Sequence, residues 1–472
     1  MPIQTRTAGN ALLALALACA STTATAAAAE HALPNLGWTG DPFGYAALAI
    51  FAISYVFVVL EERLHLRKSK PVVLAAGLIW LLIALGLAAR GGEPGLAAEG
   101  FREIFLEFAS LFFFLVVAMC FVSAIAERNV FEAMRAELVS RGFSFRQLFW
   151  LTGLMGFFLS PVLDNLTTAL VMAGVILAVG GGNKRFVSLA CINLVVAANA
   201  GGAWSAFGDI TTLMVWQAQK VEFTEFFAIL VPSLVNWLVP AAIMHFAIPN
   251  ERPAVRADDA DIRYGGLAIC GLFAATIAIT VLAKNFLHMP PVFGMMFGLG
   301  LLNLLAYHIT LRERRAAKTG DSYSIFRILA NAEWDTLLFF YGVLLAVGGL
   351  AMLGYIAAAS SALYIGLGPT WANITMGTLS AIVDNIPIMY AVLQMNPAMD
   401  HGQWLLITLT CGVGGSMLSV GSAAGVALMG QSKGQYTFMS HLRWSWAIAL
   451  GYAASIATHL LLNAKYFTGQ PG

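Results

Sequence analysis

Residues 160–168 read SPVLDNLTT and place an aspartate, an asparagine and hydroxyl groups inside a long apolar run. A second version of the motif, SAIVDNIP, occupies residues 380–387. An ionisable side chain in hydrocarbon costs at least about 2.5 kcal/mol, so such a residue indicates a functional site. Two such motifs in matching settings indicate that the chain is organised around the pair.

The composition is typical of a polytopic helical membrane protein. The chain has 472 residues, of which 59% are hydrophobic and 11% are charged. Its net charge of +1 gives no sign of nucleic-acid binding, so the expected surroundings are the lipid bilayer and not a nucleic acid. Cysteines and histidines are scattered along the chain, and we expect no cofactor.

The N-terminus has the pattern of a targeting segment. Arg6 precedes an apolar run at 11–20, and small residues follow around 24–29. This pattern predicts a cleavable signal peptide over residues 1–29, with an uncleaved first helix as the alternative. After cleavage the N-terminus would lie in the periplasm.

Ten full membrane spans are predicted from apolar runs that can cross a ~30 Å core. Two further apolar segments, 143–180 and 362–395, carry the Asp-Asn motifs near their middle. We interpret them as re-entrant helical hairpins, because irregular backbone at that depth is tolerated only against protein or a wet cavity. The ten predicted spans cover residues 44–60, 71–89, 104–126, 186–217, 226–248, 264–283, 290–310, 335–354, 404–429 and 442–463.

The positions of lysine and arginine support this topology. With an outside N-terminus and two hairpins, the predicted cytoplasmic loops hold 20 of the 26 lysine and arginine residues, as the positive-inside rule requires. The C-terminus is then also periplasmic. We expect residues 311–330 to form a basic cytoplasmic connector, and we expect no lysine or arginine within the membrane to hold an anion.

The two halves of the chain repeat one order of elements, namely span, hairpin, glycine-broken span and span. The first half covers residues 44–310, with its repeat at 104–248, and the second covers residues 331–466. After the hairpins, residues 199–212 read NAGGAWSAFGDITT and residues 414–422 read GGSMLSVGS. The number of spans between the hairpins makes the second enter from outside. We therefore predict an inverted repeat with two glycine-broken transmembrane helices around a midplane site.

Three aspartates, Asp164, Asp209 and Asp384, lie deep in this topology. Hard oxygen ligands suit an alkali cation. A carboxyl group removed from water favours its protonated form, whereas a nearby sodium ion favours the ionised form. One site can therefore exchange the two ions. We expect Asp164 and Asp209 to be the pair that exchanges them, with Asn165 as a further sodium ligand.

Polar residues from both halves are expected around these aspartates. For each hydroxyl, a bond to its own helix is the alternative. Three histidines at cytoplasmic ends, His65, His308 and His441, could sense pH or be ordinary loop residues. The expected polar neighbours are Thr167, Asn199, Thr211 and Thr212 in the first half and Ser380, Asn385, Ser419 and Ser422 in the second.

The blocks at 160–168 and 199–212, together with DNIP at 384–387, resemble the NhaD-type sodium/proton antiporters of the ion transporter superfamily. The resemblance runs from about residue 44 to the C-terminus. It implies exchange of Na⁺ or Li⁺ for H⁺, and a homodimer in which hairpin-bearing transport domains slide against a scaffold. Ser422 stands where the first half has Asp209, so the two half-sites cannot be chemically equivalent.

We therefore expect a secondary transporter of the bacterial cytoplasmic (inner) membrane, and not an enzyme. It would exchange Na⁺ or Li⁺ for protons by alternating access. One alternative is an arsenite or organic-anion carrier of the same superfamily, although the dicarboxylate carriers have Ser-Asn-Thr where this chain has Asp-Asn. The other is a passive cation channel, which would need a continuous wet path.

Overall fold

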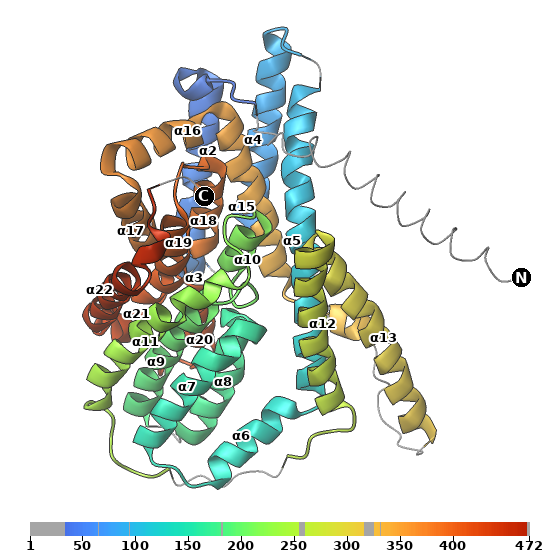
Figure 1. The fold of residues 1–472 in the computed structure, drawn as a ribbon, viewed down its shortest axis with the longest axis vertical. Helices are drawn as coiled ribbons and strands as arrows, with labels where there is room; N and C mark the ends of the chain where they lie inside the picture. The colour runs from blue at the N-terminus through green and yellow to red at the C-terminus, as the bar shows by residue number, and fades with distance from the viewer. Residues whose placement is uncertain are drawn as a thin grey trace, which may run out of the picture.

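The structure, a computed structural model, describes residues 34–64, 66–93, 95–180, 183–253, 260–315, 325–330 and 332–469 (Figure 1). Every regular element in these ranges is a helix, so the predicted all-α class is confirmed. The predicted signal peptide and His65 lie outside the described residues. In chain order the elements are η1 (Trp38–Gly40), α2 (Pro42–Val59), α3 (Glu61–Leu64), α4 (Ser69–Ala89), α5 (Leu96–Glu127), α6 (Val130–Ser140), α7 (Phe145–Leu163), α8 (Asn165–Gly180), α9 (Lys184–Ala203), α10 (Ile210–Gln217), η2 (Glu225–Ile229), α11 (Leu230–His245), α12 (Gly266–Leu287), α13 (Pro291–Arg315), α14 (Ile325–Ala330), α15 (Trp334–Leu353), α16 (Tyr355–Ser360), the π-helical η3 (Ser361–Ile365), α17 (Pro369–Leu379), α18 (Asn385–Met395), α19 (His401–Gly414), η4 (Gly415–Met417), α20 (Ala423–Gln431), α21 (Phe438–Leu442), α22 (Ser445–Leu462) and η5 (Ala464–Tyr466).

Among the described residues, nine helices are long and apolar enough to cross a membrane, as expected for a polytopic membrane protein. They are α2, α4, α5, α9, α11 with η2, α12, α13, α15 and α22. Nine of the ten predicted spans correspond to these helices. The tenth, residues 404–429, is interrupted between α19 and α20. The span predicted at 186–217 is also broken, because its helix stops at Ala203 and resumes at Ile210.

The helices form two groups. In the first group, α15 packs along α4 and α5, and α2 packs on α4. α12 and α13 also pack on α5. In the second group, α7, α8 and α11 surround α9, while α17 and α22 pack on α19 (Figure 1). α15 of the first group contacts α18 of the second. The helix breaks that carry the polar motifs therefore lie close to the boundary between the groups.

α9 is the centre of the second group. Almost every residue from Phe186 to Ala203 is buried, which is possible because much of the helix consists of small or β-branched side chains. Asn193, in the middle of the helix, has a partner for each of its two side-chain polar atoms: it donates to the carbonyl of Phe149 and accepts from the indole of Trp237, both at 2.8 Å. A buried polar group with all its partners adds specificity to the packing of α7, α9 and α11.

The N-terminal ends of α4 and α15 lie together. Ser69 at the start of α4 donates a hydrogen bond to Asp335 at the start of α15. Further along, the indole of Trp80 donates to the carbonyl of Leu345 at 2.9 Å. A Cβ at Gly342 would lie 2.7 Å from the backbone of Val72, so the two helices approach too closely for a side chain at that position.

Two predicted boundaries differ from the structure. The second motif-bearing segment was expected to begin at residue 362, but α17 starts at Pro369 after Gly368, whose φ of 76° ends the preceding helix. Proline favours the first turn of a helix, where its missing N–H is not needed. The connector predicted at 311–330 is partly helical, because α13 continues to Arg315 and α14 begins at Ile325.

Candidate ion-binding site

Asp164 lies at the break between α7 and α8 in an unusual backbone conformation. Its φ and ψ are 66° and 163°, a combination that costs a residue with a side chain about 1–3 kcal/mol. The carboxylate accepts hydrogen bonds from the backbone N–H and the hydroxyl of Thr167, each at 2.8 Å. Asp164 therefore caps the start of α8, and α7 and α8 pack against each other on either side of it.

Asp209 lies at the break between α9 and α10 and is 4% exposed. Its Oδ1 accepts from the backbone N–H of Thr211 at 2.9 Å and from the Thr211 hydroxyl at 3.0 Å. Its Oδ2 accepts from the amide of Asn165 at 2.9 Å and from that of Asn385 at 2.8 Å. The asparagines of both Asp-Asn motifs thus converge on one carboxylate oxygen.

Asn199 connects the two halves a second time. Its side-chain carbonyl accepts from Asn165 at 3.3 Å, and its NH₂ group donates to the hydroxyl of Ser422 at 3.1 Å. Ser422 caps α20 as Asp209 caps α10, since each side chain accepts from a backbone N–H in the first turn of the helix that follows. The two broken helices therefore meet through the hydrogen bond between Asn199 and Ser422.

The remaining predicted hydroxyls differ in their hydrogen-bond partners. Thr212 donates to the carbonyl of Asp209 at 2.6 Å, and Ser380 donates to that of Gly377 at 2.8 Å. These bonds are the local backbone pairing named above as the alternative. The Ser419 hydroxyl is buried and has no hydrogen-bond partner among the described residues.

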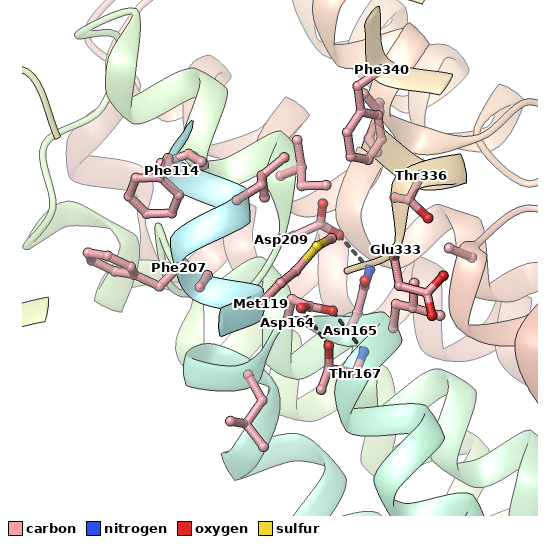
Figure 2. A pocket seen from close by; sticks show the side chains of 18 of the residues that line it. Phe114, Met119, Asp164, Asn165, Thr167, Phe207, Asp209, Glu333, Thr336 and Phe340 are labelled. Atoms are coloured by element: carbon pink, nitrogen blue, oxygen red, sulfur yellow. Dashed lines mark hydrogen bonds between the residues drawn. The ribbon is translucent and has the colours of Figure 1, made fainter. Parts of the chain in front are cut away.

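Six of the predicted residues line one cavity of about 80 Å³: Asp164, Asn165, Thr167, Asp209, Asp384 and Asn385. Figure 2 shows Asp164, Asn165, Thr167 and Asp209 gathered on one side, with Glu333 and Thr336 facing them. Phe114, Phe207 and Phe340 contribute apolar walls. The other predicted residues, Asn199, Thr211, Thr212, Ser380, Ser419 and Ser422, are buried around the helix breaks and do not line the cavity.

Comparison with known proteins gives two results. A family model described as a citrate transporter (CitMHS) matches residues 6–412. The protein called Na(+)/H(+) antiporter NhaD from Alkalimonas amylolytica is 50% identical over 451 residues, covering 92% of this chain and 93% of its own. Those of the same name from Halomonas elongata and Vibrio cholerae are each 51% identical over 452 residues, covering 92% of this chain and 91% and 94% of theirs.

The chain belongs to the NhaD family. Its similarity extends to a plant protein, since Sodium/proton antiporter 1 of Arabidopsis thaliana is 30% identical over 448 residues, or 92% of this chain and 75% of that protein. The NhaD relatives match nearly the whole chain, so the compared regions include every helix break described above.

The structure places a cation beside the site of this NhaD family member that the sequence did not indicate. No lysine or arginine was expected within the membrane to hold an anion; Lys68, which was placed in a cytoplasmic loop, lines the cavity, and its Nζ lies 3.1 Å from Oδ2 of Asp384. The side chains are 15% and 12% exposed, respectively. Lys68 was assigned to a cytoplasmic loop because it belongs to a cluster of basic residues. The structure brings it to the cavity from the N-terminus of α4.

Sequence reasoning also missed Glu333 and Thr336, which line the cavity from the start of α15. Glu333 precedes the predicted span that begins at residue 335, and Thr336 is the second residue of that span. Their sequence signal was weak, because acidic and hydroxyl residues are common where a helix begins.

His441 was considered as a pH sensor, but the structure makes it a buried core residue in α21. Its Nε2 donates to the carbonyl of Ser416 at 2.9 Å, and Nδ1 accepts from the hydroxyl of Tyr436 at 2.7 Å. Burial lowers the pKa of His441 from 6.5 to about 4, although the bond to Ser416 opposes the shift. The ring is therefore neutral at physiological pH.

We expect His441→Gln to leave the pH dependence of transport unchanged between about pH 7 and 9, because the ring does not change charge there. The free energy of unfolding should respond instead. As the pH falls from 6.5 towards 4, the unfolded chain binds a proton at His441 that the folded chain does not, so acid destabilises the wild type. Thermal melts across this window should show a smaller acid-induced loss in the variant. A shifted transport profile would contradict the assignment.

Proposed function

We propose that this member of the NhaD family exchanges Na⁺ or Li⁺ for H⁺ across the bacterial cytoplasmic membrane. The observation that carries the proposal is the buried carboxylate of Asp209, which accepts hydrogen bonds from Asn165 and Asn385 at 2.9 and 2.8 Å. Such a carboxylate joins both Asp-Asn motifs at one point. The names of the relatives, which are sodium/proton antiporters, support the same function.

The chemistry follows from the charge of the cavity. Asp164, Asp209 and Asp384 contribute carboxylates to a cavity whose walls are largely apolar. A carboxylate in such surroundings is stabilised by a bound proton or by a cation, and the two compete for the same oxygens. We propose that Na⁺ is held by Asp164, Asp209 and Asn165, and that its arrival displaces a proton. Exposure of the site to each side in turn then exchanges the ions.

Repeated contacts support the proposed internal repeat. The hydroxyl of Ser160 donates to the carbonyl of Ala198 at 2.6 Å, and that of Ser380 donates to the carbonyl of Cys411 at 3.1 Å. Both serines stand four residues before the aspartate of their motif, and both acceptors stand eleven residues before the side chain that caps the resumed helix. The two motifs thus hold their broken helices by equivalent bonds.

Helix lengths support the re-entrant interpretation. α8, α17 and α18 have 16, 11 and 11 residues, or about 24, 16 and 16 Å at 1.5 Å per residue. None of these reaches across a ~30 Å core. We propose that α7–α8 and α17–α18 enter the membrane as hairpins whose tips meet at the cavity. The homodimer, the periplasmic termini and the cleaved signal peptide stay predictions.

Carriage of an organic anion is the competing function, because the matching family model is described as a citrate transporter. The charges around the cavity disfavour it. The described residues that line the cavity include Asp164, Asp209, Glu333 and Asp384 but only one cation, Lys68, which is paired with Asp384. A citrate anion would bring further negative charge to this set.

The function can be tested in everted membrane vesicles that hold an acid-inside pH gradient. Sodium or lithium chloride should dissipate the gradient with the wild type, whereas choline citrate should not, because only the former supplies the exchanged cation. Asp164→Asn should remove the sodium response, since the variant lacks a charge that sodium can neutralise. A gradient that responds to choline citrate and not to sodium chloride would show that the proposed function is wrong.

A further inference from the structure

Lys68 is held in one position by two interactions. Its Nζ lies 3.1 Å from Oδ2 of Asp384 and 4.3 Å from the centroid of the Phe339 ring. An ammonium group that is largely removed from water and placed on an aromatic face has few other positions available. The side chain therefore forms part of the cavity wall and does not move freely at the end of α4.

The ammonium group belongs to the same cavity as the proposed sodium ligands. Lys68 and Asp384 line it together with Asp164 and Asp209. The second oxygen of Asp384, Oδ1, is buried and accepts no hydrogen bond among the described residues. Asp384 therefore has one oxygen occupied by a cation of the protein and one that is free.

We propose that Lys68 is a tethered counter-ion that sets the affinity of the site for sodium. Its fixed positive charge repels a cation in the cavity, and its bond to Asp384 withholds one carboxylate oxygen from the transported ion. The site then binds sodium weakly enough to release it at each turnover. This inference rests on the proposed sodium/proton exchange and identifies a residue that tunes it.

A purely structural role for the ion pair makes a different prediction. Lys68 immediately precedes α4 of the first helix group, while Asp384 lies between α17 and α18 of the second, so the pair could merely fasten the groups together. Loss of either partner would then lower the maximum rate in the same way. A counter-ion requires opposite effects on sodium affinity, because the two substitutions change the charge of the cavity in opposite directions.

The test measures the apparent KM for sodium from gradient dissipation in everted vesicles. Lys68→Gln should lower it roughly fivefold to tenfold, and Asp384→Asn should raise it by a similar factor because it leaves the ammonium unpaired. The double variant should return to within about twofold of the wild type. Lys68→Arg keeps the charge and should stay near the wild type. Lys70→Gln, at an exposed position of the same helix, is the matched control.

Each outcome decides one of the two proposals. If wild type and Lys70→Gln do not respond to sodium, the proposed exchange is wrong. If they respond and Lys68→Gln has an unchanged or higher KM, the counter-ion is wrong. Should Lys68→Gln fail to accumulate in the membrane, Asp384→Asn is compared with the double variant. Restoration of sodium affinity in the double variant supports the counter-ion, and its absence overturns it.

Discussion

Asp209→Asn is expected to reduce sodium-driven proton exchange by at least about 100-fold. The substitution removes the buried charge that proton and sodium are proposed to neutralise in turn. It also disturbs the hydrogen bonds. Oδ1 of Asp209 accepts from Thr211, and Oδ2 accepts from both Asn165 and Asn385. An asparagine has an acceptor oxygen in place of only one of the two carboxylate oxygens, so in either orientation its NH₂ group faces another donor.

Sodium binding and transport should be lost together in this variant. Sodium that binds the folded protein raises its melting temperature in proportion to ln(1 + [Na⁺]/Kd), so a sodium titration of the melting temperature in detergent measures binding directly. The wild type should show this rise and Asp209→Asn should not. Asp261→Asn removes an aspartate from an exposed loop and is the control. Exchange by Asp209→Asn within tenfold of the wild type would exclude the central role of this carboxylate.

The sequence predicted the residues and helix breaks of the site better than it predicted the hydrogen-bond partners of those residues. The motif Asp-Asn inside an apolar run, and glycines before Asp209, were sufficient to place breaks where α8 and α10 begin. Asp164 and Asp209 were expected to act together on the exchanged ions, and both line the cavity. Their hydrogen-bond partners were not predicted: Asp164 accepts from Thr167, while Asp209 accepts from Asn385 of the other half. A periodic pattern fixes which residues share a helix face, but the partner from a distant helix depends on packing that a single sequence does not contain.

Lys68 shows a second limit of prediction from a single sequence. Within residues 61–70 it is one of four basic residues, and the positive-inside rule explains all four equally well. Only the packing of α4 on α15, and of α15 on α18, selects Lys68 to reach the cavity. Likewise, hydroxyls predicted as ion ligands, such as Thr212 and Ser380, donate to backbone carbonyls close to them in the chain. Composition gave the right residue types, and local geometry decided their use.

Gly201→Ala is expected to destabilise the fold strongly. Gly201 lies near the C-terminal end of α9, which packs on α7. A Cβ at this position would lie against the backbone of Phe157 in α7, 2.9 Å from its carbonyl carbon. Backbone on both sides cannot yield as a flexible side chain would. The helices must therefore separate, at a cost of about 3 kcal/mol. Gly414 is the equivalent position in the other half, where a Cβ would be 2.9 Å from the carbonyl carbon of Gly377.

The experiment compares three glycine-to-alanine variants by thermal melting in detergent. Gly201→Ala and Gly414→Ala should each lower the melting temperature by on the order of 5 °C. Gly174→Ala is the matched control, because Gly174 lies inside α8 and a Cβ there would meet nothing within 4 Å. Alanine favours helix over glycine, so this variant should melt at or slightly above the wild-type temperature. If all three variants melt alike, close approach of backbone at Gly201 and Gly414 does not hold the broken helices against α7 and α17.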